Sequence, residues 1–186
     1  ATIMRTLLVK RLDSSFYAFT ASLRRFRDAT KVMIDMFERG TVYIAPNLPV
    51  NQLILEGREE ELVALIAEKQ DADPTIEVCK PEDFAEDLLS GLRRDLERIA
   101  PILADWEQVV DSNQDPKFDL FLRRLRDELL HRDLNREGKL VVFSESRETT
   151  DYLTKRLSLS GFNRVLTIDA SNRNARRDDI RANFDA

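Results

Sequence analysis

Apolar side chains recur every three or four residues over the first part of the chain, which is the spacing of one face of an α-helix. This spacing predicts a long helix that ends at Gly40, because glycine readily adopts the conformation that closes a helix. Asp13, Ser14 and Ser15 allow an alternative, since their side chains can cap a new helix that begins at Phe16. The apolar face consists of Met4, Leu8, Leu12, Phe19, Leu23, Phe26, Met33 and Phe37.

Helical spacing continues through the middle of the chain. Residues 53–70 predict one helix, and Pro81 suits the first position of the next. Pro101 lies inside that next helical pattern, so we expect a kink or two helices there. Asp115 and Pro116 suit the cap and the first turn of a further helix. The apolar face of that helix comprises Phe118, Phe121, Leu122, Leu125 and Leu129.

The periodicity changes after Gly138. Residues 139–144 and 164–169 are short, nearly continuous apolar runs, which are typical of strands buried on both faces. Residues 149–159 and 175–184 have helical spacing, so the order is strand, helix, strand, helix, with parallel strands and a right-handed crossover. Two parallel strands do not make a stable sheet. We therefore expect either that the chain is a piece of a longer protein or that its sheet is completed by something outside this chain.

The pattern as a whole predicts an α/β fold that is predominantly helical. A long helical N-terminal part and a helical insertion precede a partial βαβα unit. The expected boundaries are residues 1–44 for a linking helix, 45–135 for the insertion with its connecting helix, and 136–186 for the βαβα unit.

Charge is distributed unevenly along the chain, whose net charge is −5. Residues 50–115 contain 6 Lys and Arg against 18 Asp and Glu, a balance of −12. The balance is +4 over residues 1–49, +1 over 116–135 and +2 over 136–186. A phosphate backbone is repelled by the acidic part and tolerated by the flanks. The acidic insertion is interpreted either as an inert protrusion or as a docking surface for a basic protein partner.

Composition excludes several classes of protein. The single cysteine, Cys79, and the single histidine, His131, exclude an internal disulfide, a cysteine-cluster zinc site and a metal site built on several histidines. No apolar run approaches the ~20 residues that cross a bilayer, and the start lacks the apolar stretch of a signal peptide. We expect no membrane association and a cytoplasmic location. With 5 glycines and no Gly-x-x-x-x-Gly-Lys-Ser/Thr sequence, the chain has no phosphate-binding loop.

Three stretches carry a resemblance to a known family. Residues 5–19 read Arg-Thr-Leu-Leu-Val-Lys-Arg-Leu-Asp-Ser-Ser-Phe-Tyr-Ala-Phe. Residues 115–117 read Asp-Pro-Lys, and after a helix residues 138–147 read Gly-Lys-Leu-Val-Val-Phe-Ser-Glu-Ser-Arg. Arg177 and then Phe184 follow. In this order they resemble the Swi/Snf-like branch of the superfamily-two helicases: the exit from the first RecA-like domain, motif IV, and an arginine-phenylalanine pattern of the second domain.

The resemblance implies a fragment of an ATP-dependent helicase or DNA translocase that contains the start of the second RecA-like domain, the helicase C-terminal domain. In the full-length parent, ATP and Mg would bind between two RecA-like domains, and hydrolysis would step the protein along DNA. The phosphate-binding loop of this family belongs to the first domain. The resemblance therefore implies that this fragment binds no cofactor and hydrolyses no ATP by itself.

The loops after the two predicted strands hold the candidate nucleic-acid contacts. Ser144, Ser146 and Arg147 follow the first strand, and Ser171 and Arg173 follow the second. Hydroxyls, guanidinium groups and helix N-termini bind phosphates without reading sequence, so we expect non-specific and salt-sensitive binding. The alternative interpretation is that the serines cap helices and the arginines are surface charges.

Two other functions fit parts of the pattern. The chain can be read as a non-enzymatic helical protein-interaction module attached to an α/β domain. It can also be read as a receiver-like α/β domain, although Ser144 and Glu145 stand where that class requires an acidic pair at the end of the first strand.

Overall fold

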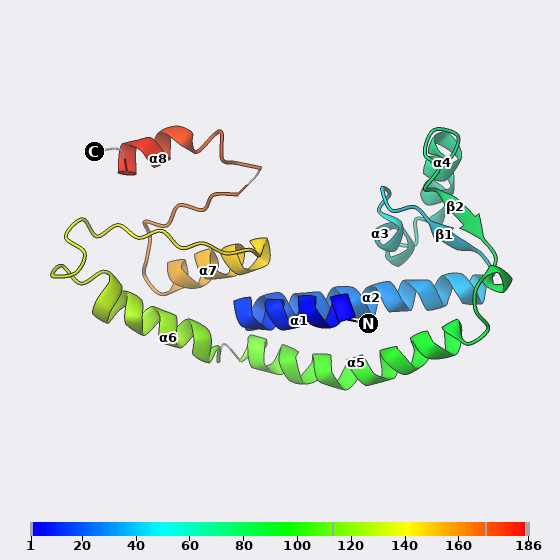
Figure 1. The fold of residues 1–186 in the computed structure, drawn as a ribbon, viewed down its shortest axis with the longest axis horizontal. Helices are drawn as coiled ribbons and strands as arrows, with labels where there is room; N and C mark the ends of the chain where they lie inside the picture. The colour runs from blue at the N-terminus through cyan, green and yellow to red at the C-terminus, as the bar shows by residue number, and fades with distance from the viewer. Residues whose placement is uncertain (1, 113, 170, 185–186) are drawn as a thin grey trace. The chain divides into compact units, whose positions relative to one another are not determined.

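The computed structural model describes residues 2–112, 114–169 and 171–184, without the side chains of residues 2–5. The described chain is predominantly helical, as the sequence predicts (Figure 1). Its elements in order are α1 (Thr2–Ser14), α2 (Phe16–Arg39), β1 (Val42–Ile44), α3 (Val50–Leu55), α4 (Glu59–Lys69), β2 (Glu77–Cys79), the 3₁₀ turn η1 (Pro81–Asp83), α5 (Leu88–Asp111), α6 (Pro116–Arg124), the π-helical turn η2 (Leu125–Leu129), α7 (Arg147–Leu159) and α8 (Arg177–Phe184). No described helix combines the length and apolarity needed to cross a bilayer.

Two compact units divide the structure. The first comprises the residues up to 21 and those from 108 onward, and the second comprises residues 22–107. The second unit contains 11 Lys and Arg against 19 Asp and Glu, so the acidity of the chain belongs to it. These units are spatial groupings of residues. The predicted boundaries at 44/45 and 135/136 separate a linking helix, an insertion and a βαβα unit, which is a different kind of division, and they stay predictions.

The second unit has a core shared by α2, α3, α4 and a two-stranded antiparallel sheet. Strands β1 and β2 pair Val42 with Cys79, Tyr43 with Val78 and Ile44 with Glu77. This sheet could not be predicted from the sequence, because runs of three residues are too short to show an alternating pattern. The core comprises Val32, Met36, Phe37, Val42, Ala45, Val50, Leu53, Ile54, Leu62, Ile66 and Ile76.

Helix boundaries test the local predictions. A break between α1 and α2 falls at Ser15, whose hydroxyl accepts a hydrogen bond from the backbone N–H of Ala18 at 3.0 Å. The alternative of a capped helix from Phe16 is therefore confirmed, and the single uninterrupted helix is wrong. The single helix over 53–70 is also wrong: α3 and α4 are separated at Gly57, which has a φ of +69° that disfavours other residues.

Neither Pro81 nor Pro101 begins or ends a long helix. Pro81 opens only the short turn η1, and the long helix α5 begins at Leu88. Pro101 lies inside α5, which continues through it to Asp111, so the prediction of two helices is wrong. A proline inside a helix removes one backbone hydrogen bond, and Figure 1 shows α5 as one continuous, curved ribbon.

The first unit packs α6 against α7. Its buried core consists of Phe118, Leu125 and Leu157, with Phe121 and Leu122 partly buried beside them. The predicted apolar face of the helix that follows Asp115 is confirmed for these positions. Leu129 is 39% exposed and does not belong to it.

The two apolar runs after Gly138 differ from the prediction. Within the described residues, 139–144 and 164–169 have no strand assignment, and the β1–β2 pair is the sheet that the structure contains. Figure 1 shows both runs as coil, one before and one after α7 along the chain. Phe143 is 91% exposed, Val141 and Val142 are about half exposed, and Val165, Leu166 and Ile168 of the second run are 36–41% exposed. The predicted pair of parallel strands is therefore not formed among the described residues. Two strands alone cannot bury the apolar side chains on both of their faces.

Candidate functional site at the start of helix α7

Three helix N-termini in the first unit are capped by side chains from the motif stretches. Ser15 caps α2, Asp115 caps α6 and Ser146 caps α7. The Ser146 hydroxyl is the acceptor for the backbone N–H of Thr149 at 3.4 Å, and Ser146 is only 3% exposed. A helix start has unpaired N–H groups, and a capping oxygen satisfies one of them.

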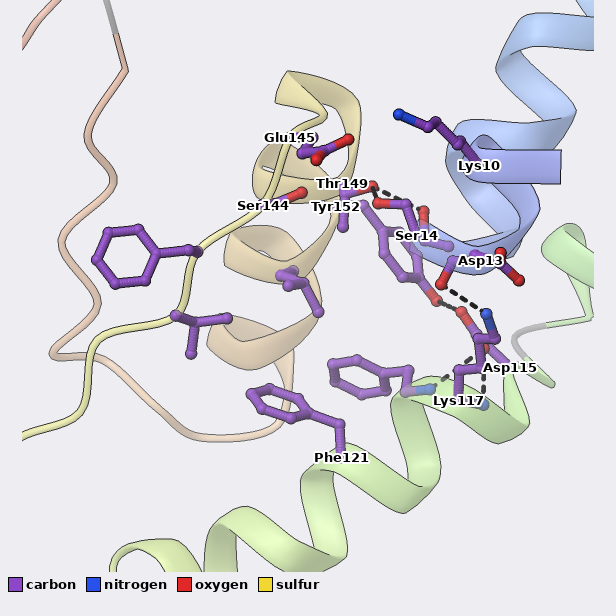
Figure 2. A pocket seen from close by; sticks show the side chains of 15 residues that line it. Lys10, Asp13, Ser14, Asp115, Lys117, Phe121, Ser144, Glu145, Thr149 and Tyr152 are labelled. Atoms are coloured by element: carbon purple, nitrogen blue, oxygen red, sulfur yellow. Dashed lines mark hydrogen bonds between the residues drawn. The ribbon is translucent and has the colours of Figure 1, made fainter. Parts of the chain in front are cut away.

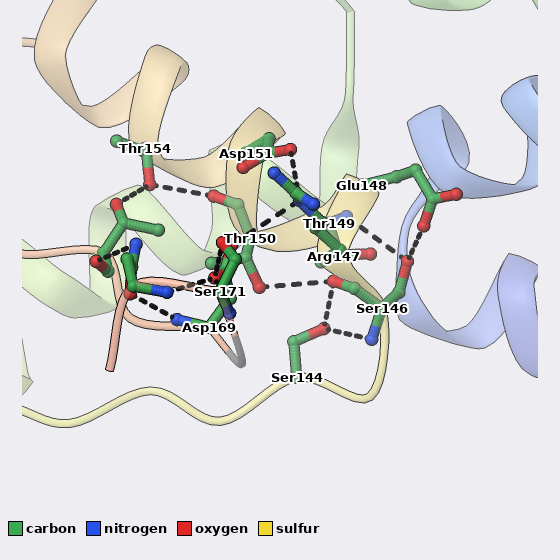
Figure 3. Close-up of polar contacts among 12 residues, drawn as sticks. Ser144, Ser146, Arg147, Glu148, Thr149, Thr150, Asp151, Thr154, Asp169 and Ser171 are labelled. Atoms are coloured by element: carbon green, nitrogen blue, oxygen red, sulfur yellow. Dashed lines mark hydrogen bonds and ion pairs between the residues drawn. The ribbon is translucent and has the colours of Figure 1, made fainter. Parts of the chain in front are cut away.

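A charged and hydroxyl-rich cluster surrounds the start of α7. Nη1 of Arg11, on α1, donates to the Ser146 hydroxyl at 2.6 Å and to Oε2 of Glu148 at 3.0 Å. The Ser146 hydroxyl in turn donates to Oε2 of Glu148 at 2.9 Å (Figure 3). The Thr149 hydroxyl lies 2.8 Å from that of Ser14 and 3.1 Å from that of Ser15. We call Arg11, Ser14, Ser15, Ser146, Glu148 and Thr149 the clamp, because they tie the α1–α2 break to α7.

Asp115 joins α6 to α7 beside the clamp. Its Oδ1 accepts from the backbone N–H groups of Lys117 and Phe118, and its Oδ2 accepts from the hydroxyl of Tyr152 at 2.8 Å. Burial, and then the hydrogen bond to this carboxylate, raise the pKa of Tyr152 well above its ordinary value. The phenol therefore keeps its proton and remains a donor. Its ring also stacks on that of Tyr17, with centroids 5.1 Å apart and planes 8° apart.

Lys117 connects α6 to the end of α1. Its ammonium donates to the backbone oxygens of Leu12 and Asp13, both at 2.8 Å. A cation is favourable at a helix C-terminus, where carbonyl groups lack partners and carry negative partial charge. The α1–α2 break is thus held by α6 on one side and by α7 on the other.

A cavity of about 570 Å³ opens beside these contacts (Figure 2). In the view the Tyr152 side chain reaches from α7 to Asp115. Phe121 lies below it on α6, and Ser144 and Glu145 lie to its upper left, on the segment that precedes α7. The lining mixes two lysines and three carboxylates with aromatic and aliphatic groups, and it contains neither cysteine nor histidine. In the described part of the chain, no group of three or more His, Cys, Asp or Glu side chains could hold a metal ion.

The candidate residues of the first loop differ in exposure. Ser144 is exposed, and its hydroxyl lies 3.1 Å from the backbone nitrogen of Ser146, which donates to it. The hydroxyl of Ser146 is buried in the clamp and acts as the helix cap, which is the alternative interpretation for this serine. Arg147 is exposed, with its Nε 3.8 Å from Asp151 and 3.5 Å from Asp169.

The second loop is held by Asp169. Oδ1 of Asp169 accepts from the hydroxyl of Ser171 at 2.5 Å and from its backbone N–H at 2.8 Å (Figure 3). These hydrogen bonds, the backbone N–H of Asn172 and the nearby Arg147 lower the pKa of Asp169. Arg173 is exposed, and its guanidinium has no partner among the described residues. The Arg147–Asp169 pair therefore brings the two predicted loops together.

Sequence reasoning missed Arg11, Thr149 and Tyr152. Arg11 lies in the stretch that carries the resemblance, but its partners are 135 and 137 residues away in sequence. Thr149 and Tyr152 lie in the predicted helix without any distinguishing pattern. Their roles depend on contacts between elements that are far apart in sequence, and a local sequence pattern does not predict such contacts.

The chain matches no protein-family model, no curated protein and no solved structure.

Proposed function

We propose that this chain is part of a cytoplasmic, ATP-dependent helicase or DNA translocase, and that it supplies the start of the second, nucleic-acid-binding RecA-like domain. In this proposal, 139–144 and 164–169 are adjacent parallel strands, joined by α7, in a sheet that further strands complete. ATP and Mg would bind to the full-length protein, and DNA would bind through backbone contacts.

The observation that carries the proposal is the assembly of the resembling stretches. Residues 5–19, 115–117 and 138–147 are far apart in sequence but belong to one compact unit. Arg11 bonds to Ser146, and Lys117 bonds to the backbone of Leu12 and Asp13. Motifs that serve one motor function are expected to meet in space, whereas chance similarities have no reason to do so.

The exposure of the two apolar runs also supports the proposal. A continuous apolar run has hydrophobic side chains on both faces, so one covering layer cannot bury it. Burying a large apolar side chain is worth about 1.5–3 kcal/mol, and exposed residues such as Val141, Val142 and Phe143 lack this stabilisation here. A parallel sheet with helices on both faces is the arrangement that buries such runs.

The exposed candidates define the nucleic-acid surface of the proposal. Arg147 and Arg173 are exposed residues with guanidinium groups, and Ser144 and Ser171 are exposed residues of the same two loops. In this conformation the Ser146 hydroxyl is buried, so we assign it to positioning the loop rather than to direct contact with phosphate. Arginine suits the contact role because its planar group donates several hydrogen bonds to phosphate oxygens.

Charge reversal at the two arginines tests this surface. Arg147→Glu combined with Arg173→Glu is expected to weaken binding of single- and double-stranded DNA by at least ~10-fold and to reduce the slope of log affinity against log salt by about 2, one for each lost phosphate contact. Binding of DNA to the full chain is measured by fluorescence anisotropy of the DNA over a range of salt concentrations. Arg132→Glu is the matched control, because Arg132 is also an exposed arginine of the first unit and lies outside both loops.

The control separates local contacts from overall charge. If Arg132→Glu alters affinity and salt slope as much per charge as the double variant does, then the loops have no special role and the proposed surface is wrong. If the unchanged chain binds no nucleic acid at low salt, the proposed function is wrong.

The compact, acidic second unit favours the alternative of a non-enzymatic interaction module. It has its own core and an excess of 8 carboxylates over cationic side chains. Such a surface suits a basic protein partner and repels phosphate. Absence of nucleic-acid binding in the experiment above would leave this alternative as the better account.

A further inference from the structure

A buried polar network lies directly behind the first candidate loop. Ser15, Ser146 and Thr149 are each at most 5% exposed, yet all three carry hydroxyl groups. Every one of these hydroxyls has a hydrogen-bond partner within the clamp. A buried and fully satisfied polar network fixes one arrangement of its elements, because any other arrangement leaves buried donors and acceptors unpaired.

Arg11 is the one cationic member of this network. Its guanidinium reaches from α1 across to the cap residue and to the first turn of α7, and it bonds to Ser146 and Glu148 through the same nitrogen. Hydrogen bonds from a charged donor are stronger than neutral ones. The Arg11 side chain is 32% exposed and that of Glu148 is 27% exposed, so solvent screens the pair only in part.

The candidate contacts flank the residue that Arg11 holds. Ser144 is bonded to the backbone of Ser146, and Arg147 follows Ser146 directly. Ser146 therefore fixes the backbone from which both of these side chains project. Loss of the Arg11 contact would free this backbone while leaving Ser144 and Arg147 chemically intact.

We propose that Arg11 is a positioning residue for nucleic-acid binding: through Ser146 and Glu148 it holds the 144–147 loop in the conformation that presents Ser144 and Arg147 to a phosphate backbone. This inference rests on the proposed function and names a residue outside the contact surface. The linking helix α1 thereby controls the geometry of a loop more than 130 residues further along the chain.

The test compares Arg11→Ala with Lys10→Ala in the full chain. Each variant removes one positive charge from the same turn of α1, but the clamp hydrogen bonds among the described residues involve Arg11 and not Lys10. We expect Arg11→Ala to speed amide hydrogen exchange over residues 144–149 without nucleic acid, and Lys10→Ala to leave it unchanged. Arg11→Lys keeps the charge on a shorter side chain and is expected to give an intermediate exchange rate.

Affinity measurements supply the second readout. Arg11→Ala is expected to weaken DNA binding about as much as Arg147→Ala does, and to add little in an Arg147→Ala background, because residues that act through one another are not additive. Additive losses would mean that Arg11 contacts phosphate itself, which overturns the positioning role. Unchanged exchange over 144–149 in Arg11→Ala, with normal DNA binding by the unchanged chain, overturns the inference while the proposed function stands. Failure of the unchanged chain to bind DNA overturns the proposed function and this inference with it.

Discussion

Replacement of Asp115 by alanine is expected to lower the free energy of unfolding of the first unit by about 2–4 kcal/mol, the sum of a lost helix cap and an unsatisfied tyrosine hydroxyl. Asp115 is 4% exposed and serves two helices. Its Oδ1 caps α6 through the backbone of Lys117 and Phe118, while its Oδ2 holds the hydroxyl of Tyr152 on α7.

Amide exchange of α7 under native conditions measures this loss, because it reports the opening of the first unit without requiring both units to unfold together. Asp119→Ala is the matched control. Asp119 is an exposed carboxylate in the first turn of the same helix, so it shares the helix-dipole effect but not the cap. A loss in Asp115→Ala no larger than that in Asp119→Ala would contradict the assigned role.

Phe118→Ala is expected to lower the same free energy by about 3–5 kcal/mol, the range for truncating a buried phenylalanine. Phe118 is 3% exposed in the core between α6 and α7. Its ring meets that of Tyr152 edge-on, with centroids 6.1 Å apart, and the Arg156 guanidinium lies 4.5 Å from its centroid. Alanine would remove both aromatic contacts and leave a cavity.

Leu120→Ala provides the comparison for the core substitution, since Leu120 lies on the same helix with 46% of its surface exposed. We expect it to change stability by no more than about 0.5 kcal/mol, as is usual at the surface. Chemical denaturation followed by tyrosine fluorescence, together with exchange at α7, measures both variants. Equal effects of the two substitutions would mean that α6 does not pack against α7 through Phe118.

Features encoded by neighbouring residues could be predicted from the sequence. The caps at Ser15 and Asp115 follow from short polar side chains that stand immediately before an apolar helical pattern, so the information is local. The predominance of helix follows in the same way from sustained spacing. The helix that begins at Pro116 and the helix that ends before Gly161 needed no knowledge of distant contacts.

Features that depend on distant partners could not be predicted. Strands β1 and β2 pair across about 35 residues, and each is too short to show a period. Helical spacing continues through both Gly57 and Pro101, yet the helix is interrupted at Gly57 and continues through Pro101. Whether a breaker breaks a helix depends on what packs around it, which the sequence pattern does not contain.

The candidate site shows the same limit. Ser146 could be predicted as a candidate because it follows an apolar run and precedes a helix. Its contact with Arg11, and those of Thr149 with Ser14 and Ser15, could not, because these partners come from the opposite end of the sequence. The apolar runs 139–144 and 164–169 have the composition of buried strands. Their composition indicates that they are stable when buried in a sheet. The coil that they form here has no adjacent strands to bury them.

Amide hydrogen exchange of residues 139–144 and 164–169 in the full-length protein tests the central claim most directly. If these runs are adjacent strands of a RecA-like sheet, their amides should be strongly protected and should gain or lose protection together, whereas in chain 1–186 alone they should exchange rapidly. Exchange of both runs at unprotected rates in the full-length protein, with α7 still protected, would contradict the account.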